Sequence, residues 1–371
     1  LDKLIISAPL GQSVANTALP VSVLTGDNLR QKIAATLGET LANEPGITNQ
    51  SFGPGVGQPV IRGQSGSRVS VMQNGLGSLD VSALSPDHAN STDAFFAQRI
   101  EILRGPSSLL YGSSAIGGVV NVIDNRIPVL SYENLLEGAV EQRYNTVNEG
   151  KTTAFKVDGN HSFLAFHLDG VFNESVALQI PDYAVDITKN SGNYNSHNRL
   201  RNSQNRKKLG TVGFSVNGGL GYIGFSINHQ TNHYGVPPET ADEMVRIDAT
   251  QSRYDLKAEL TEPIIGINNI LMRLAYNDYQ HVELENNQPG TTYNHEGFEG
   301  RLEITHPAWW LFEHGVFGVQ TRNSQFSALG AEAIVPKSSI DSIGVFTVQD
   351  LHSPLGIYEF GLRVEHQSIN P

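Results

Sequence analysis

Hydrophobic and polar residues alternate along most of this chain from Asn125 onward. Residues 163–171 (FLAFHLDGV) and 358–365 (YEFGLRVE) place an apolar side chain at nearly every second position. Because successive side chains of a strand point to opposite faces, such segments predict strands with one apolar and one polar face. About eleven strands of this kind are expected. A soluble β-sandwich and a membrane barrel both show this alternation, so the pattern alone leaves both folds open.

The lengths of the connections favour the barrel. Short turns are expected at 159–161, 217–220, 263–268 and 353–356, and long polar connections near 173–207, 229–250, 282–296 and 326–339. Up-and-down membrane barrels have short turns at one end and long loops at the other. We therefore expect a transmembrane antiparallel β-barrel over residues 129–371.

The N-terminal part has a different, mixed α/β pattern. A strand is predicted at Val21–Leu24 and a helix at Leu29–Leu37, where apolar residues recur every four positions. A second short helix is expected at Thr40–Glu44, where Pro45 would end it. Residues 100–124, IEILRGPSSLLYGSSAIGGVVNVID, alternate glycines with short apolar runs, which is typical of a packed strand–turn–strand core.

Five segments resemble, in the same order, the plug domain of the TonB-dependent outer-membrane receptors. They are LANEPGI (41–47), PVIRG (59–63), VSVMQNG (69–75), RIEILRGPSSLLYG (99–112) and AIGGVVNVI (115–123). The resemblance implies a plug domain at 1–128 inside a transmembrane β-barrel at 129–371. Receptors of this kind close at about 22 strands. About half of the barrel is thus expected here, and because an open half leaves two unpaired edges in lipid, we expect the chain to be a fragment of a longer receptor.

Composition narrows the possible chemistry. The 371 residues include no cysteine, which excludes disulfides and thiolate ligands, and 25 Lys and Arg against 37 Asp and Glu give a net charge of -12, which disfavours nucleic acid as a partner. No apolar run approaches the ~20 residues of a membrane helix. The sequence lacks a His-Glu-x-x-His motif, a nucleophile elbow and a nucleotide-binding loop, so we expect no enzyme and no required cofactor.

The N-terminal residues predict an energy-coupling contact. The segment Leu4, Ile5, Ile6, Ser7 and Ala8 resembles the coupling box of these receptors, an extended stretch that can add as a strand to a partner's sheet. This resemblance implies a TonB-type energy-transducing protein as partner. A frayed terminus is the alternative. The start of the chain shows no signal peptide, so we expect an exported protein to have lost it already.

One loop of the plug carries a candidate metal site. Asp87 and His88 are adjacent, and zinc accepts carboxylate oxygen and imidazole nitrogen at about 2.0–2.2 Å. On these residues alone, a solvated Asp-His pair is the alternative. Residues 74–89, NGLGSLDVSALSPDHA, resemble the plug loop of the zinc-uptake (ZnuD) group of the family. That resemblance implies that Asp87 and His88 bind zinc together with a carboxylate of the barrel and a further histidine, and a position beyond Pro371 stays open for the fourth ligand.

Barrel residues are candidates for further ligands. We expect Glu332, in a long external loop, to supply the carboxylate. His281, Glu283 and Glu285 have the two-residue spacing that puts side chains on one face of a strand, and they predict a secondary capture site. A polar lumen wall is the alternative. The family often carries a His- and acid-rich external loop, whereas residues 230–243 contain one histidine and few acids, which leaves zinc capture by that loop in doubt.

The predicted function is TonB-dependent active import of zinc, or of a zinc complex, across the bacterial outer membrane, with the barrel in contact with lipid. An iron-siderophore or haem receptor of the same family is the first alternative. A passive porin or an adhesin is a second, but neither needs a plug. The sequence leaves the form of the metal and the oligomeric state open.

Overall fold

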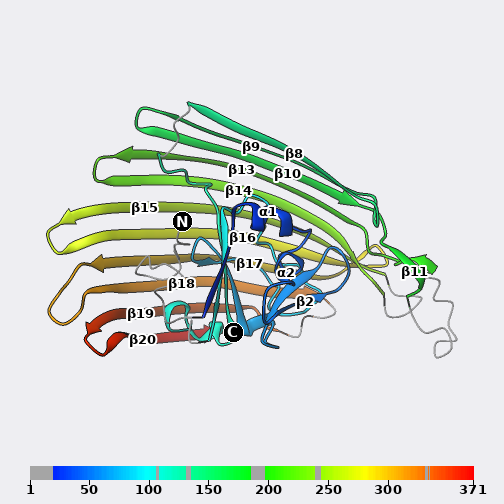
Figure 1. Ribbon diagram of the computed structural model, residues 1–371. Helices are drawn as coiled ribbons and strands as arrows, with labels where there is room; N and C mark the ends of the chain where they lie inside the picture. The colour runs from blue at the N-terminus through cyan, green and yellow to red at the C-terminus, as the bar shows by residue number, and fades with distance from the viewer. Residues whose placement is uncertain are drawn as a thin grey trace.

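The structure is a computed structural model that describes residues 20–105, 108–130, 135–184, 197–238, 244–330, 333 and 335–371. Eleven of its strands form one curved antiparallel sheet (Figure 1). They are β8 (Leu136–Asn145), β9 (Gly150–His161), β10 (Leu164–Ser175), β13 (Asn205–Gly218), β14 (Gly221–Val236), β15 (Val245–Ile264), β16 (Ile267–Glu285), β17 (Gln288–His306), β18 (His314–Gly330), β19 (Ser338–Ser353) and β20 (Gly356–Asn370). A separate pair, β11 (Gln179–Tyr183) and β12 (His197–Arg199), lies between β10 and β13 in the chain. Closure of the barrel at about 22 strands stays a prediction.

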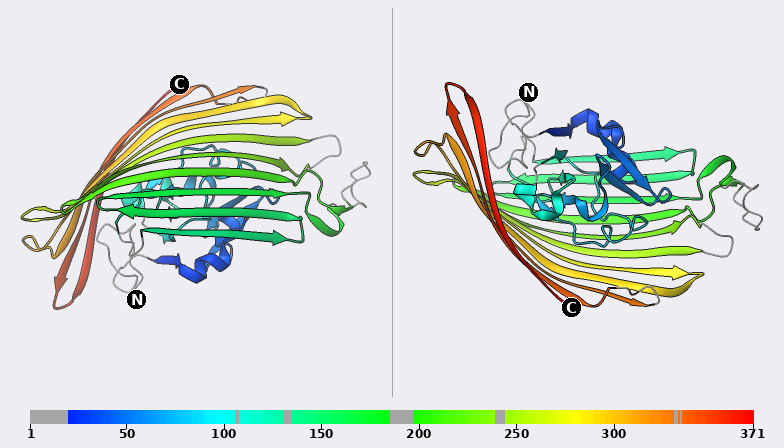
Figure 2. Two further views of the ribbon diagram at one scale, coloured as in Figure 1. Left: turned by 90° about the horizontal axis from the view of Figure 1, so that it is seen from above. Right: turned by 90° about the horizontal axis from the view of Figure 1, so that it is seen from below.

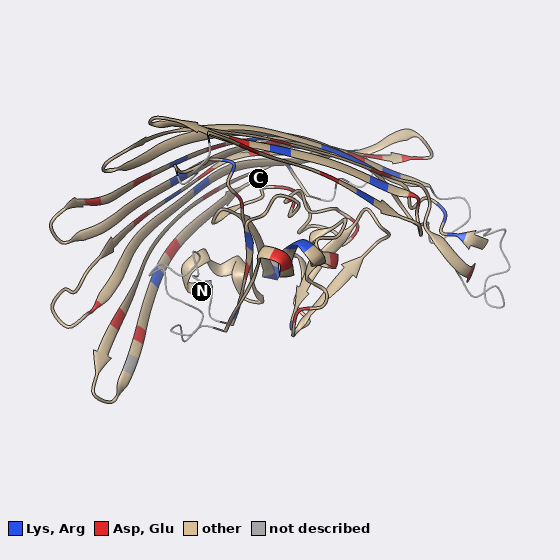
Figure 3. Ribbon diagram, turned by 45° about the horizontal axis from the view of Figure 1, so that its top comes forward, with Lys and Arg blue, Asp and Glu red and all other residues tan. Residues whose placement is uncertain are grey.

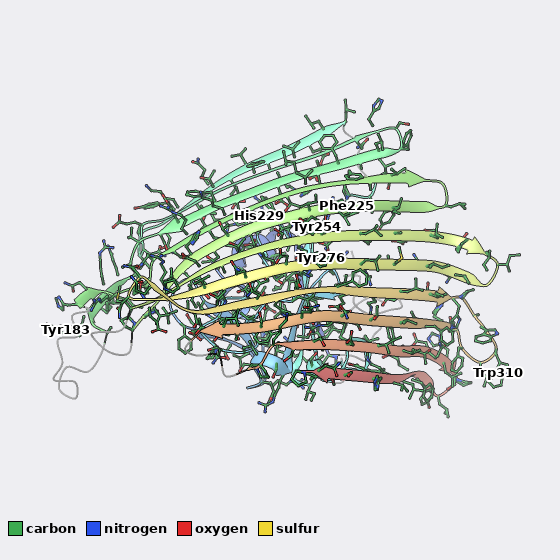
Figure 4. The ribbon with its side chains drawn as sticks, turned by 180° about the vertical axis from the view of Figure 1, so that it is seen from behind. Tyr183, Phe225, His229, Tyr254, Tyr276 and Trp310 are labelled. Atoms are coloured by element: carbon green, nitrogen blue, oxygen red, sulfur yellow. The ribbon has the colours of Figure 1, made fainter. Side chains whose placement is uncertain are left out.

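The two faces of the large sheet differ as the alternation predicts. On β13, Phe214 and Val216 are exposed, whereas Ser215 between them is completely buried. Figure 4 looks onto the convex face, where Tyr254 and Tyr276 lie with their rings 6.2 Å apart. An apolar outer face and a polar inner face are the arrangement found in membrane barrels.

The connections between strands agree with three predicted turns, place the turn predicted at 159–161 at Ser162 and Phe163 instead, and correct one predicted loop. Two residues each join β9 to β10, β13 to β14, β15 to β16, and β19 to β20. The long connection expected at 282–296 is wrong, because β16 runs to Glu285 and β17 begins at Gln288. The turn consists of Asn286 and Asn287, whose φ angles are 49° and 67°. Two positive φ angles are typical of a tight type I′ hairpin, which asparagine tolerates.

The N-terminal part lies on the concave side of the sheet (Figure 2). Its elements are β1 (Val21–Thr25), α1 (Gly26–Lys32), α2 (Leu37–Leu41), β2 (Ile47–Ser51), β3 (Gly57–Ile61), η1 (Gly66–Arg68), β4 (Val69–Gln73), β5 (Leu76–Gly77), β6 (Arg99–Arg104), α3 (Ser108–Tyr111), η2 (Ser113–Ala115) and β7 (Gly118–Ile123). A five-stranded sheet has the order β1-β6-β7-β4-β5, and β2 pairs with β3. Strands β6 and β7 are almost wholly buried, so the glycine-rich segment is the centre of this domain. The predicted boundary between 128 and 129 falls between β7 and β8.

The first two helices differ from their prediction. Helix α1 ends at Lys32, so the helix expected over Leu29–Leu37 is wrong in its second half. Thr36 is extended, and its side chain accepts a hydrogen bond from the backbone N–H of Glu39. This N-cap starts the new helix α2, which also begins earlier than the predicted Thr40. None of the described helices is long and apolar enough to cross a membrane.

Charged side chains fix the N-terminal domain to the wall formed by the sheet. Acidic and basic residues occur along several strands of this wall (Figure 3). Arg301 on β17 pairs with Glu303 and donates a 2.7 Å hydrogen bond to the backbone oxygen of Leu110. On β13, Lys207 pairs with Asp93 at 2.6 Å. These contacts place one surface of the domain firmly against the polar face of the wall.

Candidate metal site

A loop of the N-terminal domain, residues 78–92, brings His88 to the wall. The side-chain amide of Gln58, on β3, donates hydrogen bonds of 2.8–3.0 Å to three backbone oxygens of this loop, including that of His88. From the wall, the hydroxyl of Tyr234 on β14 accepts a 2.9 Å hydrogen bond from the backbone N–H of Ala89. The loop is thus held from both sides, and His88 is only 2% exposed.

Strand β16 supplies two more side chains at the same place. His281 and Glu283 are two residues apart, so they share the inner face of the strand. They are 0% and 6% exposed. The hydroxyl of Tyr279, on the same face, lies 3.0 Å from Nδ1 of His281. Tyr293 on β17 packs its ring against the rings of both histidines, which closes the site with apolar surface.

The ligand atoms of His88, His281 and Glu283 converge. One ligand atom from each of the three lies within 4.8 Å of the other two. Oε1 of Glu283 is 3.0 Å from Nε2 of His88 and 3.6 Å from Nε2 of His281. Nδ1 of His88 contacts the backbone oxygen of Val81 at 3.0 Å. Because both Nδ1 atoms have partners, both Nε2 atoms point toward the carboxylate, as they do in metal sites whose histidines are oriented by outer hydrogen bonds.

One atom of this cluster has no hydrogen-bond partner. Nε2 of His281 is buried and makes no hydrogen bond within the described part of the chain, although Oε1 of Glu283 lies 3.6 Å away. A buried polar atom without a partner is costly, and it calls for an explanation such as an ion that the protein binds. The cluster therefore has the composition of a cation site and one donor atom that a cation would satisfy.

The charge of Glu283 acts on His88. Burial alone would lower the pKa of His88, but the hydrogen bonds to Glu283 and to the backbone oxygen of Val81, together with the nearby charge of Asp87, raise it above the ordinary value for histidine. Without a cation, His88 therefore tends to keep a proton on Nε2 and to donate it to Glu283. A metal ion would replace that proton.

The structure brings together some of the predicted site residues and separates others. His88, from the predicted plug pair, joins His281 and Glu283, from the predicted secondary site, in one cluster. The carboxylate of Asp87 lies outside it and accepts a hydrogen bond from the hydroxyl of Ser85. Glu285 is exposed at the end of β16. Glu332 and the segment Leu4, Ile5, Ile6, Ser7 and Ala8 lie outside the described residues.

Sequence reasoning missed that the two predicted sites form one. The two-residue spacing of His281 and Glu283 was a signal, but His88 and Glu283 are 195 positions apart, and no local pattern links them. The supporting residues Gln58 and Tyr234 carried no signal either, because a buried amide and a tyrosine of a barrel wall are ordinary in composition.

Comparison with known proteins agrees with the architecture. Residues 13–119 match the TonB-dependent Receptor Plug Domain. A relative from Yersinia pestis named "Hemin receptor" is 30% identical over 166 residues, which are 44% of this chain and 22% of the relative. The matched part of the chain therefore spans less than a quarter of the length of that curated relative.

Solved structures show the same fold. The chain superposes on a structure named "Copper transporter OprC" with a TM-score of 0.76 and 16% identity, covering 95% of this chain and 56% of that one. For the ferric enterobactin receptor PfeA the TM-score is 0.71 and the identity 16%, with 95% and 59% covered. The FrpB iron transporter from Neisseria meningitidis gives 0.73 at 13% identity, with 94% and 59% covered.

The plug match covers the domain on the concave side, and the wall has the strand arrangement of the receptor barrels. The chain therefore carries a domain that matches the TonB-dependent receptor plug, beside a sheet with the fold of receptor barrels of the bacterial outer membrane.

Proposed function

We propose that this receptor imports zinc, as the ion or as a small complex, and that His88, His281 and Glu283 bind the metal on its way through. The unpartnered Nε2 of His281, buried beside a histidine and a glutamate, is the observation that carries the proposal. Neutral imidazole and carboxylate are the ligands that zinc prefers in a cysteine-free site.

The distances within the cluster suit such an ion. Ligand atoms about 2.0–2.1 Å from a tetrahedral ion stand roughly 3.4 Å from one another. The separations of Glu283 Oε1 from the two imidazole nitrogens, 3.0 and 3.6 Å, bracket that value. Three protein ligands leave a fourth position, which water or a donor atom of a chelator would occupy.

The proposed site also offers a route to release. His88 belongs to the plug, whereas His281 and Glu283 belong to the wall, so any movement of the plug away from the wall separates the ligands. A TonB-type protein that pulls on the N-terminal segment Leu4–Ala8 would supply that movement. Binding and release then correspond to two positions of the plug with different affinities for the metal.

Import of haem or of an iron chelate is the second candidate, favoured by the names of the relatives. The compared proteins are called a hemin receptor, a ferric enterobactin receptor and a copper transporter. Histidine also suits copper. Haem or siderophore uptake would survive loss of His281, because a large ligand does not enter a cluster whose atoms lie within 4.8 Å of one another.

Calorimetric titration of the purified receptor with zinc tests the proposal. We expect His281→Ala to weaken zinc binding by about 100-fold or more, since loss of an outer-sphere partner alone costs 10- to 100-fold. His229→Ala is the matched control, because His229 lies on the convex face (Figure 4) and its Nδ1 makes a 3.0 Å hydrogen bond with Ser252, away from the cluster. Equal zinc affinity in both variants, or hemin uptake lost with His281, would contradict the proposal.

A further inference from the structure

A hollow lies between the plug and the wall, beside the loop that carries His88. Its volume is about 240 Å³. Its lining combines apolar residues such as Val69, Val71 and Leu79 with five polar side chains, Ser67, Ser70, Ser78, Ser82 and Asn90. On the wall side, Arg322 of β18 reaches into it. The hollow therefore combines many hydrogen-bonding groups with one permanent positive charge, since arginine stays protonated in proteins.

The guanidinium of Arg322 has an incomplete set of partners. Its Nη2 lies 3.5 Å from Nε2 of His295, a neighbour on β17. Its Nε is buried and makes no hydrogen bond. Glu299 stands opposite Arg322 across the strand pair, but its two oxygens accept hydrogen bonds from Gly77 and Gln320. No ion pair joins Arg322 to a carboxylate among the described residues.

Other arginines of the same wall form ion pairs with carboxylates. Arg253 pairs with Asp255 at 2.9 Å, and both Arg273 and Arg301 pair with Glu303 at 2.8 Å. Burying a charge without a counter-charge is expensive, and proteins normally pair it. Arg322 feels the charge of Glu299 but makes no ion pair with it among the described residues, and its side chain lines the hollow instead. This contrast points to an anion as the missing partner.

We propose that the hollow is an anion subsite in which Arg322 binds the carboxylate of a small hydroxycarboxylate. A hollow of about 240 Å³ is far larger than the ~10–15 Å³ that a single water needs, so it has room for a small molecule of several heavy atoms. The planar guanidinium presents donors at the spacing of a carboxylate. The serines and Asn90 supply donors and acceptors for hydroxyl groups. Asp80 also lines the hollow, but its oxygens are engaged by Ser82 and Ser91.

The subsite is physically linked to the candidate metal site. Nδ1 of His295 contacts the backbone oxygen of Asp80 at 3.2 Å. Asp80 and His88 belong to the same loop, residues 78–92. The ring of His295 also packs on Phe326, which packs on Tyr293 beside the metal cluster. An anion on Arg322 would therefore stabilise the loop in its ligand-bearing position. The identification of this anion as the chelator that accompanies the metal rests on the proposed function. The anion subsite itself does not rest on it.

Titration of the purified receptor with citrate in zinc-free buffer tests the subsite. We expect Arg322→Gln to weaken citrate binding at least tenfold, since hydrogen bonds to charged groups are the strongest. Arg322→Lys, which keeps the charge, should recover part of the affinity. Ser70→Leu should block binding by filling the hollow while Arg322 stays in place. Arg206→Gln is the control, because Arg206 is exposed and pairs with Glu174 away from the hollow.

The outcomes separate this proposal from the proposed function. No citrate binding by the wild type at millimolar concentration, equal affinity in Arg322→Gln, or tighter binding of inorganic phosphate than of citrate would each overturn the subsite. His281→Ala should leave zinc-free citrate binding unchanged. If citrate binds and zinc does not, the anion subsite stands and the zinc proposal fails.

Discussion

Two buried histidines on the inner face of the wall have opposite surroundings. His167 on β10 lies between two aspartates, with Nδ1 at 2.6 Å from Asp158 and Nε2 at 2.9 Å from Asp169. Arg126, just after the plug's last strand, contacts Asp169 at 3.4 Å. At the other place, His88 and His281 share a single carboxylate, no arginine is within the cluster, and one imidazole nitrogen lacks a partner.

The difference shows which cluster suits a cation. Both nitrogens of His167 are engaged by carboxylates, and Arg126 supplies a second positive charge beside Asp169. Oδ1 of Asp169 is buried without a hydrogen-bond partner among the described residues, but neither imidazole nitrogen of this group is free to bind a cation. The cluster around His281 has one donor atom to spare and a carboxylate placed between two imidazoles. We infer that the first cluster holds the plug's C-terminal end to the wall, and that the second binds the metal. The predictions below test this assignment of the two clusters.

The largest effect is expected from His167→Ala. Removing the imidazole leaves two buried aspartates without the group between them, and breaking a buried ion pair costs about 3–5 kcal/mol. Unfolding of the receptor in lipid vesicles by denaturant measures this loss. Zinc affinity should stay within about twofold of the wild type, since both imidazole nitrogens of this group are held by aspartates and none is free to bind zinc. His161→Ala, an exposed histidine on the neighbouring strand, is the control. A large loss of zinc affinity in His167→Ala would contradict the assignment of metal binding to the other cluster.

A pH titration gives the next largest effect. The pKa of His88 is raised, so the imidazole keeps its proton above the ordinary value of 6.5, and zinc must displace it. Zinc affinity should fall as pH falls, starting above pH 6.5, by up to tenfold per unit for one displaced proton. In the zinc-free receptor, folding stability changes with pH in the opposite direction. A raised pKa adds stability that is present below 6.5 and is lost as pH rises through the folded value. Calorimetry between pH 8 and 5.5 checks the first trend, and a flat profile would contradict it.

The sequence predicted the architecture better than the site. Two-residue alternation and the plug segments were enough for the sheet and for the domain inside it, because lipid and core burial impose periodic patterns. The polar residues near Asn286 indicated a loop, although they face the interior of the barrel as parts of strands. For the site, adjacency favoured Asp87 together with His88. In the fold, only His88 of this pair is buried in contact with Glu283. Contacts between residues far apart in the sequence leave no local signal.

A smaller effect is expected from Tyr234→Phe. The tyrosine hydroxyl accepts a hydrogen bond from Ala89 N–H and donates one of 3.2 Å to the backbone oxygen of Asp87, on either side of His88. Removing it loosens the loop without touching a ligand. We expect zinc to bind about tenfold more weakly, as is usual for losing an outer partner of a metal site. Tyr254→Phe on the convex face is the control (Figure 4). An unchanged affinity would mean that Gln58 alone positions the loop.

The smallest effect is expected from Glu285→Gln, and it separates two explanations of the site. Strand alternation puts Glu285 on the same face as His281 and Glu283, but Glu285 is exposed whereas the other two are buried. If lying on the same face of the strand were enough for a residue to bind zinc, neutralising Glu285 would weaken zinc binding as much as Glu283→Gln does. Because the charge of Glu285 is in water and screened over about 8–10 Å by salt, we expect less than a twofold change in affinity. Glu283→Gln, which removes the buried carboxylate ligand, should cost about 100-fold or more in the same titration.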